Sequence, residues 1–562
     1  MNAQEFPPPV KPDQFVTAPT TSADSRLDAG VLFVGAGPAG LAGAIRLAQL
    51  LETAPELKES LGEMPIVVLE KGKYPGAHLL SGAVMNPIGF QRLFPEMKVE
   101  EFPFYGPVPA ESVYFLTKSG SFQFPVVPPT MHSAGCHIAS LSKVGRWLGE
   151  KAEELGVTVL NETAGQKLVV DGGAVRGVRV GDKGLDRNGQ RMGNFEEGIE
   201  IAARFTVLSE GNQGHLTQAA LEHFGVGRPN PQIHSLGVKE VWEVAKPLDR
   251  IIHTMGWPLS LSAGASEFGG SFCYPMGKDM VSIGLVVSLD YRDASLSVHD
   301  LFQEMKLHPL FAEILEGGKR AEKGWGAKTI PEGGYWSLPE KLHVPGALVV
   351  GDSAGFVSVA SLKGIHYAMT SGILAAETIF EALKKGADPA AAVSLDSYDA
   401  AVRQSFIHDD LYKVRNMRQA FQYGFFTGGA FATMMTLTGG AFPGGKWHTE
   451  PDAAAPLYDG RRTFAKADGT MTFDKLASTY ASGNRSRDNQ PCHILLNESA
   501  PALLGQCWIS MCPAGVYEWH EQDGKKVLFV NGPNCVHCGA ITAKGGRLTP
   551  PEGGSGPEYT LM

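Results

Sequence analysis

The chain has 562 residues, a formal net charge of −10 at pH 7 and a pI near 5.9. This length exceeds what one hydrophobic core serves, so several domains are expected. The acidic balance excludes a nucleic-acid binder, which needs a basic footprint.

Residues 1–27 are proline-rich and lack the apolar run of a secretory signal peptide. We expect a disordered leader. Without a signal peptide, the seven cysteines fit a reducing compartment, where clustered thiols indicate metal or redox chemistry rather than disulfides.

A dinucleotide-binding pattern follows the leader. Val31–Val34 has strand composition, and three glycines and a helical sequence come after it. In such a unit the first glycine allows a turn, the second admits the pyrophosphate, and the third lets helix and strand pack. The helix N-terminus then faces the anion. The predicted site comprises Val34, Gly35, Ala36, Gly37, Pro38, Ala39 and Gly40.

The next predicted strand ends at Glu70, whose carboxylate would accept hydrogen bonds from the adenosine ribose. Its distance from the glycine loop exceeds the usual ~20 residues, and we attribute the excess to a helical insert at residues 50–65. The alternative is that Glu70 only ends a strand.

Two later segments favour FAD over NAD. One strand runs into Glu210 and Gly211, a second expected approach to the dinucleotide. Another buried strand ends at Gly351 and Asp352, and we predict that this pair opens a helix and binds the ribityl chain. A plain helix cap is the alternative for Asp352. Because these segments are far apart in the sequence, another domain must be inserted within the FAD domain.

Alternating sequences at residues 111–127 and 279–291 predict strands of a mixed sheet over the flavin. Gly269 and Gly270 stand together between aromatic residues. Paired glycines in a strand mark a bulge or a ligand contact, and from the residues alone we favour the bulge.

The sequence contains no run of ~18 apolar residues, so we predict no transmembrane helix. Residues 419–445 nevertheless carry no charge, and they follow a basic segment with Lys413, Arg415 and Arg418. This pattern is typical of a helix lying in the membrane interface, although a buried core segment is the alternative. Residues 122–131 form a second apolar candidate.

The tail is rich in cysteine: Cys492, Cys507, Cys512, Cys535 and Cys538. Cys512-Pro513 followed by Cys535-x2-Cys538 is ferredoxin-like spacing. Four thiolates would also suit zinc, but the Cys-Pro pair and the lack of a second CxxC favour iron–sulfur.

Together these motifs resemble one family, the electron transfer flavoprotein–ubiquinone oxidoreductases. The resemblance runs from about residue 28 to the end and includes GAGPAGLAGAIRL, GGSFCYP, CPAGVYEW and NCVHC, in that order. It implies a peripheral membrane flavoprotein with FAD and one [4Fe–4S] cluster. Such a protein accepts single electrons from reduced electron transfer flavoprotein and reduces ubiquinone.

The resemblance also implies site residues. The quinone would contact the backbone amides of Gly269 and Gly270. On this resemblance we interpret the pair as a ligand contact and no longer as a bulge. Cys512, Cys535 and Cys538 would bind the cluster.

The sequence departs from the family at the fourth ligand, where Ile541 stands and no iron can bind. We predict Cys507 as the replacement. An exogenous ligand, a three-iron cluster or no cluster are the alternatives.

The expected fold class is α/β (α+β overall), with a Rossmann-like, doubly wound FAD-binding domain, an inserted mixed-sheet quinone-binding domain and a ferredoxin-like tail. The assigned bounds are 28–490 for the discontinuous FAD domain, about 105–135 and 225–335 for the inserted parts, 405–450 for the membrane-associated part, and 491–562 for the tail.

Coupling a one-electron donor to a two-electron acceptor needs no acid–base or nucleophilic site, so we predict no catalytic side chain and interpret His253 and His366 as ordinary polar residues. The expected location is the cytoplasmic face of the inner membrane. One alternative is a related FAD-dependent oxidoreductase, similar to geranylgeranyl reductases, with a dedicated electron partner or a small organic substrate and a modified or lost cluster. Another is a binding protein with a decayed cluster domain.

Overall fold

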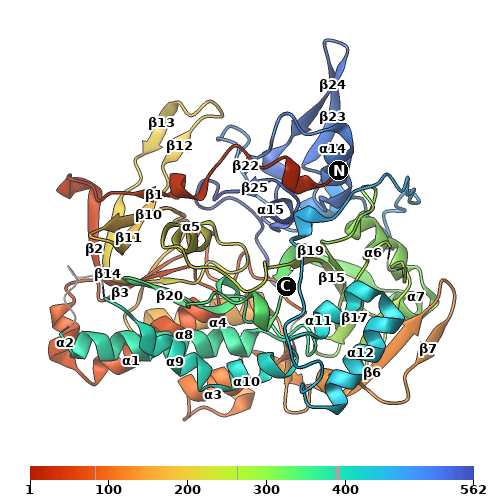
Figure 1. The fold of residues 1–562 in the computed structure, drawn as a ribbon, viewed down its shortest axis with the longest axis horizontal. Coiled ribbons are helices and arrows are strands. Elements are labelled where there is room, and N and C mark those ends of the chain that lie inside the picture. Colours follow the sequence, from red (N-terminus) through yellow and green to blue (C-terminus); the bar gives the residue numbers. More distant parts are fainter. Residues whose placement is uncertain (83, 263, 387–392) are drawn as a thin grey trace.

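The computed structural model describes residues 1–82, 84–262, 264–386 and 393–562. Two large sheets form the body of the molecule, and a smaller unit that contains the tail cysteines lies against them (Figure 1). The predicted α/β class, with an inserted sheet and a separate tail unit, is confirmed.

The first sheet has nine strands in the order β1-β10-β11-β14-β2-β3-β9, with β21 beside β14 and β20 beside β21. Strands β14, β2, β3 and β9 are parallel neighbours. Their apolar runs suit strands that are covered on both faces. The bounds are β1 Val16–Thr17, β2 Arg26–Val34, β3 Ile66–Leu69, β9 Thr158–Leu160, β10 Gly165–Asp171, β11 Ala174–Val180, β14 Glu200–Leu208, β20 His343–Val344 and β21 Ala347–Val349.

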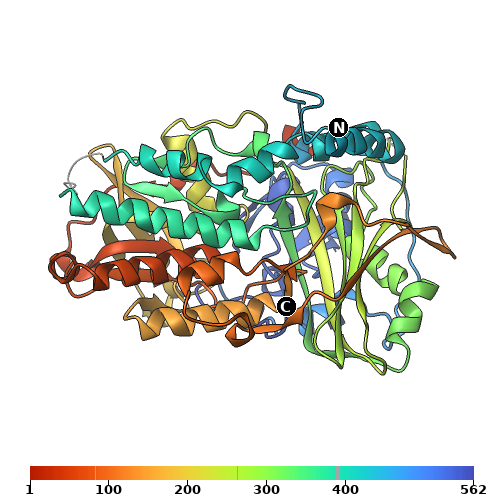
Figure 2. The ribbon, with the colours of Figure 1, turned by 90° about the horizontal axis from the view of Figure 1, so that it is seen from below.

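Helices α1 (Pro38–Glu52) and α8 (Ile365–Lys384) pack side by side in this half of the molecule (Figure 2). Pro38 begins α1, where its missing N–H costs no hydrogen bond. The other helices and strands around this sheet are α2 Pro55–Ser60, α3 Ile88–Leu93, α4 Leu141–Glu154, α5 His215–His223, α9 Asp396–Arg403, α10 Phe406–Lys413, β4 Val84–Met85, β5 Phe104–Pro107, β8 His137–Ala139, β12 Lys183–Leu185 and β13 Arg191–Glu196.

The second sheet has seven strands in the order β19-β15-β18-β17-β16-β6-β7. Both alternating segments predicted as strands lie in it. Ile283, Leu285 and Val287 of β18 pack in a core with Phe302 of α6, whereas Val286 lines a cavity, as period-2 alternation requires. The bounds are β6 Ala110–Leu116, β7 Ser121–Gln123, β15 His234–Glu243, β16 Arg250–Gly256, β17 Gly269–Pro275, β18 Met280–Ser288, β19 Lys319–Pro331, α6 Val298–Lys306 and α7 Pro309–Leu315.

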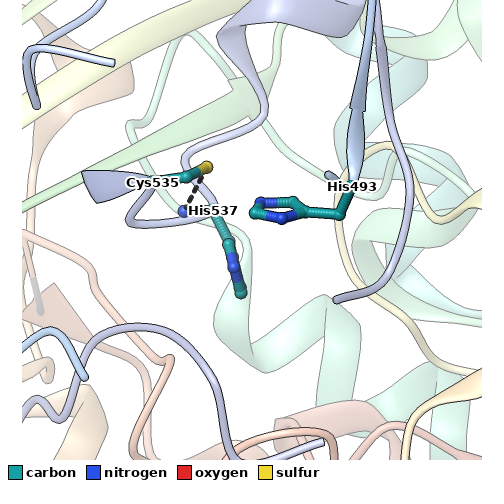
Figure 3. Close-up of side chains that lie close together, drawn as sticks. All are labelled: His493, Cys535 and His537. Carbon is teal, nitrogen blue, oxygen red and sulfur yellow. Dashed lines mark hydrogen bonds between the residues drawn. The ribbon is translucent and has the colours of Figure 1, made fainter. Parts of the chain in front are cut away.

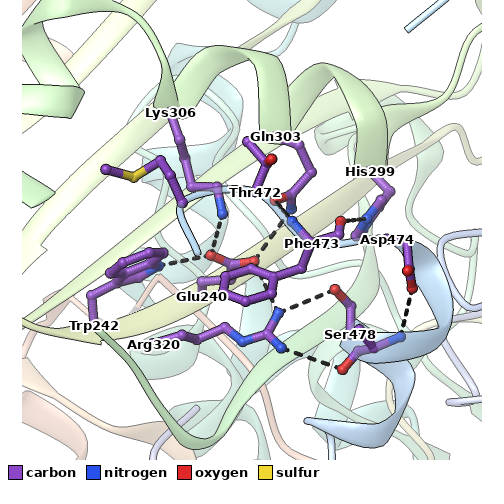
Figure 4. Close-up of polar contacts among 12 residues, drawn as sticks. Glu240, Trp242, His299, Gln303, Lys306, Arg320, Thr472, Phe473, Asp474 and Ser478 are labelled. Carbon is purple, nitrogen blue, oxygen red and sulfur yellow. Dashed lines mark hydrogen bonds and ion pairs between the residues drawn. The ribbon is translucent and has the colours of Figure 1, made fainter. Parts of the chain in front are cut away.

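A buried ion-pair network fastens this sheet to the tail region (Figure 4). The Glu240 carboxylate of β15 accepts hydrogen bonds from Lys306 of α6 at 2.7 Å and from Arg320 of β19 at 3.4 Å. The Phe473 ring covers Arg320, whose Cζ lies 3.7 Å from the ring centroid. Burial opposes ionisation of Glu240, but the two cations hold its pKa below the usual value.

The tail unit docks along edge strand β19. The Thr329 N–H and hydroxyl both donate to the Cys538 carbonyl at 2.8 Å, so the tail satisfies the exposed edge of the sheet. Its elements are α13 Lys475–Tyr480, β22 Ile494–Leu495, α14 Ala502–Met511, β23 Tyr517–Gln522, β24 Lys525–Val530, α15 Ala540–Ala543 and β25 Arg547–Leu548.

The amino-terminal segment differs from the prediction of a disordered leader. Val16 and Thr17 form β1, which pairs in parallel with β10, and Ala3 is 1% exposed. The Phe15 ring packs edge-on against His215, with centroids 5.1 Å apart. The proline-rich N-terminal segment is therefore ordered, because its apolar side chains pack against the rest of the protein.

Candidate functional site

One cavity of about 1030 Å³ reaches residues from every predicted site. This volume is at the upper end of ordinary ligand pockets, so it has room for a large cofactor and a second ligand. Its lining includes Gly35, Gly37, Glu70, Glu210, Asp352, Gly269, Gly270 and Cys538.

The three glycines of the first loop differ in what surrounds them. A Cβ on Gly40 would lie 2.1 Å from the Gly35 carbonyl oxygen, and one on Gly35, where φ is +110°, would lie 2.5 Å from the Ser209 carbonyl oxygen. A Cβ on Gly37 would have Leu79 Cδ2, at 4.0 Å, as its nearest neighbour. The outer glycines thus serve the fold, and Gly37 leaves bare backbone facing the cavity at the start of α1.

Glu70 lies directly after β3, and its side chain is buried beside this loop. Its Oε1 accepts a hydrogen bond from the Gly72 N–H at 2.6 Å. Burial raises the pKa of Glu70, although backbone donors of Gly72 and Ala36 partly oppose this. Glu70 therefore lies at the edge of the cavity. There, a hydrogen bond from a ribose hydroxyl would offset the cost of burying its carboxylate.

The Glu210 side chain is already engaged in the fold. Its Oε2 accepts from the N–H and hydroxyl of Thr217, at 2.6 and 2.7 Å, and its Oε1 lies 3.3 Å from His215 Nδ1. Burial opposes ionisation, but these hydrogen bonds hold the pKa of Glu210 below its usual value. The carboxylate caps α5, so any cofactor contact in this segment falls to the backbone of Glu210 and Gly211.

The sequence predicts that Gly351 and Asp352 open a helix, and the helix that begins at Gly351 is short. They form a single 3₁₀ turn, Gly351–Ser353, and α8 begins only at Ile365. Gly351, with φ at +59°, donates its N–H to the Ser371 hydroxyl of α8 at 2.9 Å. Burial raises the pKa of Asp352 to about 6, and the nearby positive charge of Lys328 only partly opposes this.

Gly269 and Gly270 do not form a bulge. They pair with Val287 and Val286 of β18 in regular antiparallel register. A Cβ on Gly269 would lie 2.1 Å from the Val286 carbonyl oxygen, and one on Gly270 would lie 2.4 Å from the Thr254 carbonyl oxygen. Close strand packing therefore demands both glycines, which also line the cavity.

The cavity extends to an apolar surface at the periphery. Helix α12 (Phe425–Leu437) follows α11 (Met417–Ala420) and lies across the strand ends of the second sheet (Figure 2). Only Gly428 and Met435 of α12 are buried. Phe426 and Leu437 are 70% and 77% exposed, and Val126 of the 122–131 loop is 69% exposed. All three line the cavity, so its lining continues onto this surface.

Cys512, Cys535 and Cys538 lie close together: burial raises the pKa of Cys535 and Cys538, and in both cases the nearby Cys512 thiol raises it further. Burial raises the pKa of Tyr517 well above its usual value, and negative charge on these three thiols and on Cys492 raises it further. The Val516 N–H donates to Cys512 Sγ and the His537 N–H to Cys535 Sγ, each at 3.4 Å. Soft ligands with N–H donors aimed at sulfur suit an iron–sulfur cluster.

Cys507, the fourth predicted ligand, has different neighbours. Its thiol is fully buried in α14, beside the Tyr291 hydroxyl and Lys544. Cys512 is the C-cap of that helix. Five residues of α-helix turn a side chain about 140° around the axis, so Cys507 and Cys512 leave the helix in different directions.

The sequence reasoning missed several groups between the cysteines and the rest of the cavity. Lys328 donates to the His537 carbonyl at 3.1 Å, and burial lowers its pKa to about 8. Ligand atoms of His493, Cys535 and His537 lie within 4.8 Å of one another (Figure 3). Both ring nitrogens of the buried His537 lack a partner. The position of His537 inside CxxC was the available signal.

Comparison with known proteins identifies the family. Residues 234–330 match the family model described as ETF-QO, ubiquinone-binding, and residues 469–560 match that of the electron transfer flavoprotein-ubiquinone oxidoreductase 4Fe-4S domain. The Pseudomonas aeruginosa protein named electron transfer flavoprotein-ubiquinone oxidoreductase is 37% identical over 564 residues, 95% of this chain and 98% of that one. The chain belongs to the electron transfer flavoprotein–ubiquinone oxidoreductase family.

Relatives of this oxidoreductase family extend to eukaryotes. The mitochondrial protein of the same name from Caenorhabditis elegans is 37% identical over 559 residues, 95% of this chain and 91% of that one. Among solved structures, a geranylgeranyl bacteriochlorophyll reductase-like protein from Thermoplasma acidophilum matches with a TM-score of 0.55 at 15% identity, over 74% of this chain and 96% of that one. That likeness concerns the fold alone.

Among the described residues, no helix has both the length and the apolar character needed to span a membrane.

Proposed function

We propose that this oxidoreductase takes single electrons from reduced electron transfer flavoprotein and passes them, through FAD and a [4Fe–4S] cluster, to ubiquinone in a membrane. The observation that carries the proposal is the single cavity, which joins the glycine loop, the Gly269-Gly270 strand, Cys538 and the apolar surface. Groups bound against one cavity would lie close enough for electrons to pass between them.

The FAD pyrophosphate is assigned to the glycine loop and the start of α1. Gly37 leaves room for it, and Glu70 stands where the adenosine ribose would lie. Asp352 and the backbone of Gly351 and Gly211 are assigned to the ribityl and flavin side. A polyol hydroxyl at Asp352 would donate a hydrogen bond to this half-buried acid.

The cluster is assigned to Cys512, Cys535 and Cys538. When bound, FAD supplies a store for one or two electrons, and the cluster supplies a carrier for single ones. The protein's part is to exclude water, to hold both groups next to one cavity, and to aim backbone N–H groups at the ligand sulfurs.

Quinone is assigned to the part of the cavity beside Gly269 and Gly270. It would enter beneath α12 and the 122–131 loop, whose exposed apolar side chains suit the interfacial layer of a bilayer. We place this contact at the cytoplasmic face of the inner membrane.

The test is an anaerobic assay with reduced electron transfer flavoprotein as donor and a short-chain ubiquinone as acceptor. The fully flavinylated protein should catalyse quinone reduction, and addition of NADH or NADPH without the flavoprotein donor should not. Rapid reduction by a nicotinamide, with no response to the flavoprotein, would reject the proposal in favour of a reductase that acts on a small organic substrate.

A further inference from the structure

The cysteine loop lacks one ligand at its ferredoxin-like position. In the C-x2-C-x2-C pattern of cluster loops, Cys535 and Cys538 are followed at the third place by Ile541. Ile541 is 5% exposed in the short helix α15 and packs in the apolar core of the tail unit. A cluster held as proposed above therefore needs a fourth ligand from elsewhere.

Three of the remaining four cysteines are unsuitable. Cys273 is fully buried within β17, and Cys507 faces Tyr291 and Lys544. Cys136 precedes β8, where Glu111 and Lys363 are its charged neighbours.

Cys492 occupies a different position. Its Sγ lies 3.6 Å from the place of a Cβ on Gly532, and the Gly532 carbonyl accepts the Cys535 N–H at 2.9 Å. The next residue, His493, has a ring nitrogen within 4.8 Å of Cys535 Sγ (Figure 3). Cys492 also belongs to the four thiols whose charge acts on Tyr517. It is thus brought to the cysteine loop from the opposite end of the tail unit.

We propose that Cys492 is the fourth ligand of the cluster and replaces the cysteine missing at position 541. This inference rests on the proposed cluster. In the structure the Cys492 thiol donates to the Ile494 carbonyl at 3.4 Å. Rotation about its Cα–Cβ bond to another staggered rotamer would break this weak contact and free the thiol to bind iron. The thiol releases its proton to solvent, the thiolate forms the iron–sulfur bond, and no electron is transferred.

Exposure gives the proposal a direct chemical test. Of the seven cysteines, all within the described residues, Cys492 alone is exposed. Brief alkylation of anaerobically purified, iron-loaded protein with iodoacetamide, followed by peptide mass spectrometry, should leave Cys492 unlabelled. After chelation of the iron the same residue should label readily. Equal labelling before and after chelation would show a free thiol and overturn the assignment.

Variants provide the spectroscopic test. Cys492→Ala should lower the iron-to-protein ratio by about a quarter and give the EPR signal of an oxidised three-iron cluster. Cys507→Ala, the matched control at a buried thiol, should keep the wild-type iron content and spectrum. The double variant Cys492→Ala/Ile541→Cys should regain four irons, because it restores the ferredoxin-like spacing. Recovery would exclude misfolding as the cause of the loss in the single variant.

The outcomes separate this inference from the proposed function. A four-iron cluster that is unchanged in Cys492→Ala but lost in His493→Gln would overturn Cys492 as the ligand and leave the proposed function intact. A three-iron cluster already present in the wild type would also overturn it. Wild-type protein that binds FAD but no iron would overturn both.

Discussion

The Lys328 side chain joins edge strand β19 to the cysteine loop: its Nζ lies 3.1 Å from the His537 carbonyl oxygen, between Cys535 and Cys538. The same lysine is a charged neighbour of Asp352 and Glu70 on the cavity side. Lys328 thus lies between the sites assigned to the two redox groups, and Lys71 is a second charged neighbour of Glu70 and Cys535.

Removing this charge should lower the reduction potential of the cluster, because the cation stabilises the more negative reduced state. For Lys328→Met we expect a shift on the order of 1 kcal/mol, or roughly 40 mV, in an EPR-monitored redox titration. The matched control is Lys323→Gln on the same strand, whose partner is Glu558, and it should leave the potential unchanged. An unaltered potential in Lys328→Met would refute the electrostatic role.

The glycine loop allows fold and cofactor binding to be separated. Gly40→Ala places a Cβ against the Gly35 carbonyl and should destabilise the protein by about 1–3 kcal/mol. Gly37→Ala meets no such contact, so its stability without cofactor should stay within about 0.5 kcal/mol of the wild type, while FAD affinity falls at least tenfold. Urea unfolding and FAD titration measure the two effects. Undiminished FAD binding by Gly37→Ala would contradict the pyrophosphate assignment.

The pH dependence of stability reports on Asp352. In the flavin-free protein its folded pKa of about 6 exceeds the ordinary 3.8, so its contribution to stability is greatest below about pH 4 and is lost as the pH rises through 6. Asp352→Asn cannot ionise. It should be more stable than the wild type above pH 6, by at most about 3 kcal/mol, and this advantage should vanish near pH 4. Parallel stability curves, measured by urea unfolding, would show that Asp352 does not titrate in this range.

The network around Glu240 should be costly to break. Glu240 and Lys306 are both fully buried, so Glu240→Gln leaves cations without their partner and should lower the free energy of unfolding by about 3–5 kcal/mol. Glu243 lies on the same strand and pairs with the exposed Lys319. Glu243→Gln should lower the free energy of unfolding by less than about 1 kcal/mol. Similar urea midpoints for the two variants would count against this account of how the sheet is fastened to the tail.

Helix α12 is the expected membrane contact. Phe426→Ser and Leu437→Ser each remove a large exposed apolar side chain, worth roughly 1.5–3 kcal/mol when buried in lipid. Each should reduce co-sedimentation with phospholipid vesicles about tenfold or more, without loss of FAD. The control is Tyr480→Ser, which is 88% exposed in α13. Equal losses in all three variants would point to general hydrophobicity instead of this surface.

Part of the site was predictable because it is formed by residues that are contiguous in the sequence. In the glycine loop, strand, turn and helix are contiguous, and the distinct tasks of Gly35, Gly37 and Gly40 follow from that order. The two-sheet architecture was also predictable, since alternating and continuous apolar runs report which strand faces are covered.

Other features depend on partners that are distant in the sequence or in the fold. The Glu210 carboxylate follows a strand, and the structure adds that it accepts hydrogen bonds from Thr217 and lies beside His215. The leader lacks its own core, yet β10 and the body of the protein order it. Cys507 is near Cys512 in the sequence, but the turn of α14 separates them.

The sequence by itself determined the chemical types in this protein: the glycine loop, the buried acids, the apolar segment without charge, and a tail with too few cysteines at the expected spacing. Only the tertiary structure decided which of these meet. Cys492 lies near the cysteine loop, Lys328 lies beside it, and the Glu210 carboxylate binds the N-terminus of α5. These positions depend on side-chain directions and long-range hydrogen bonds, which are set by packing between segments that are far apart in the chain.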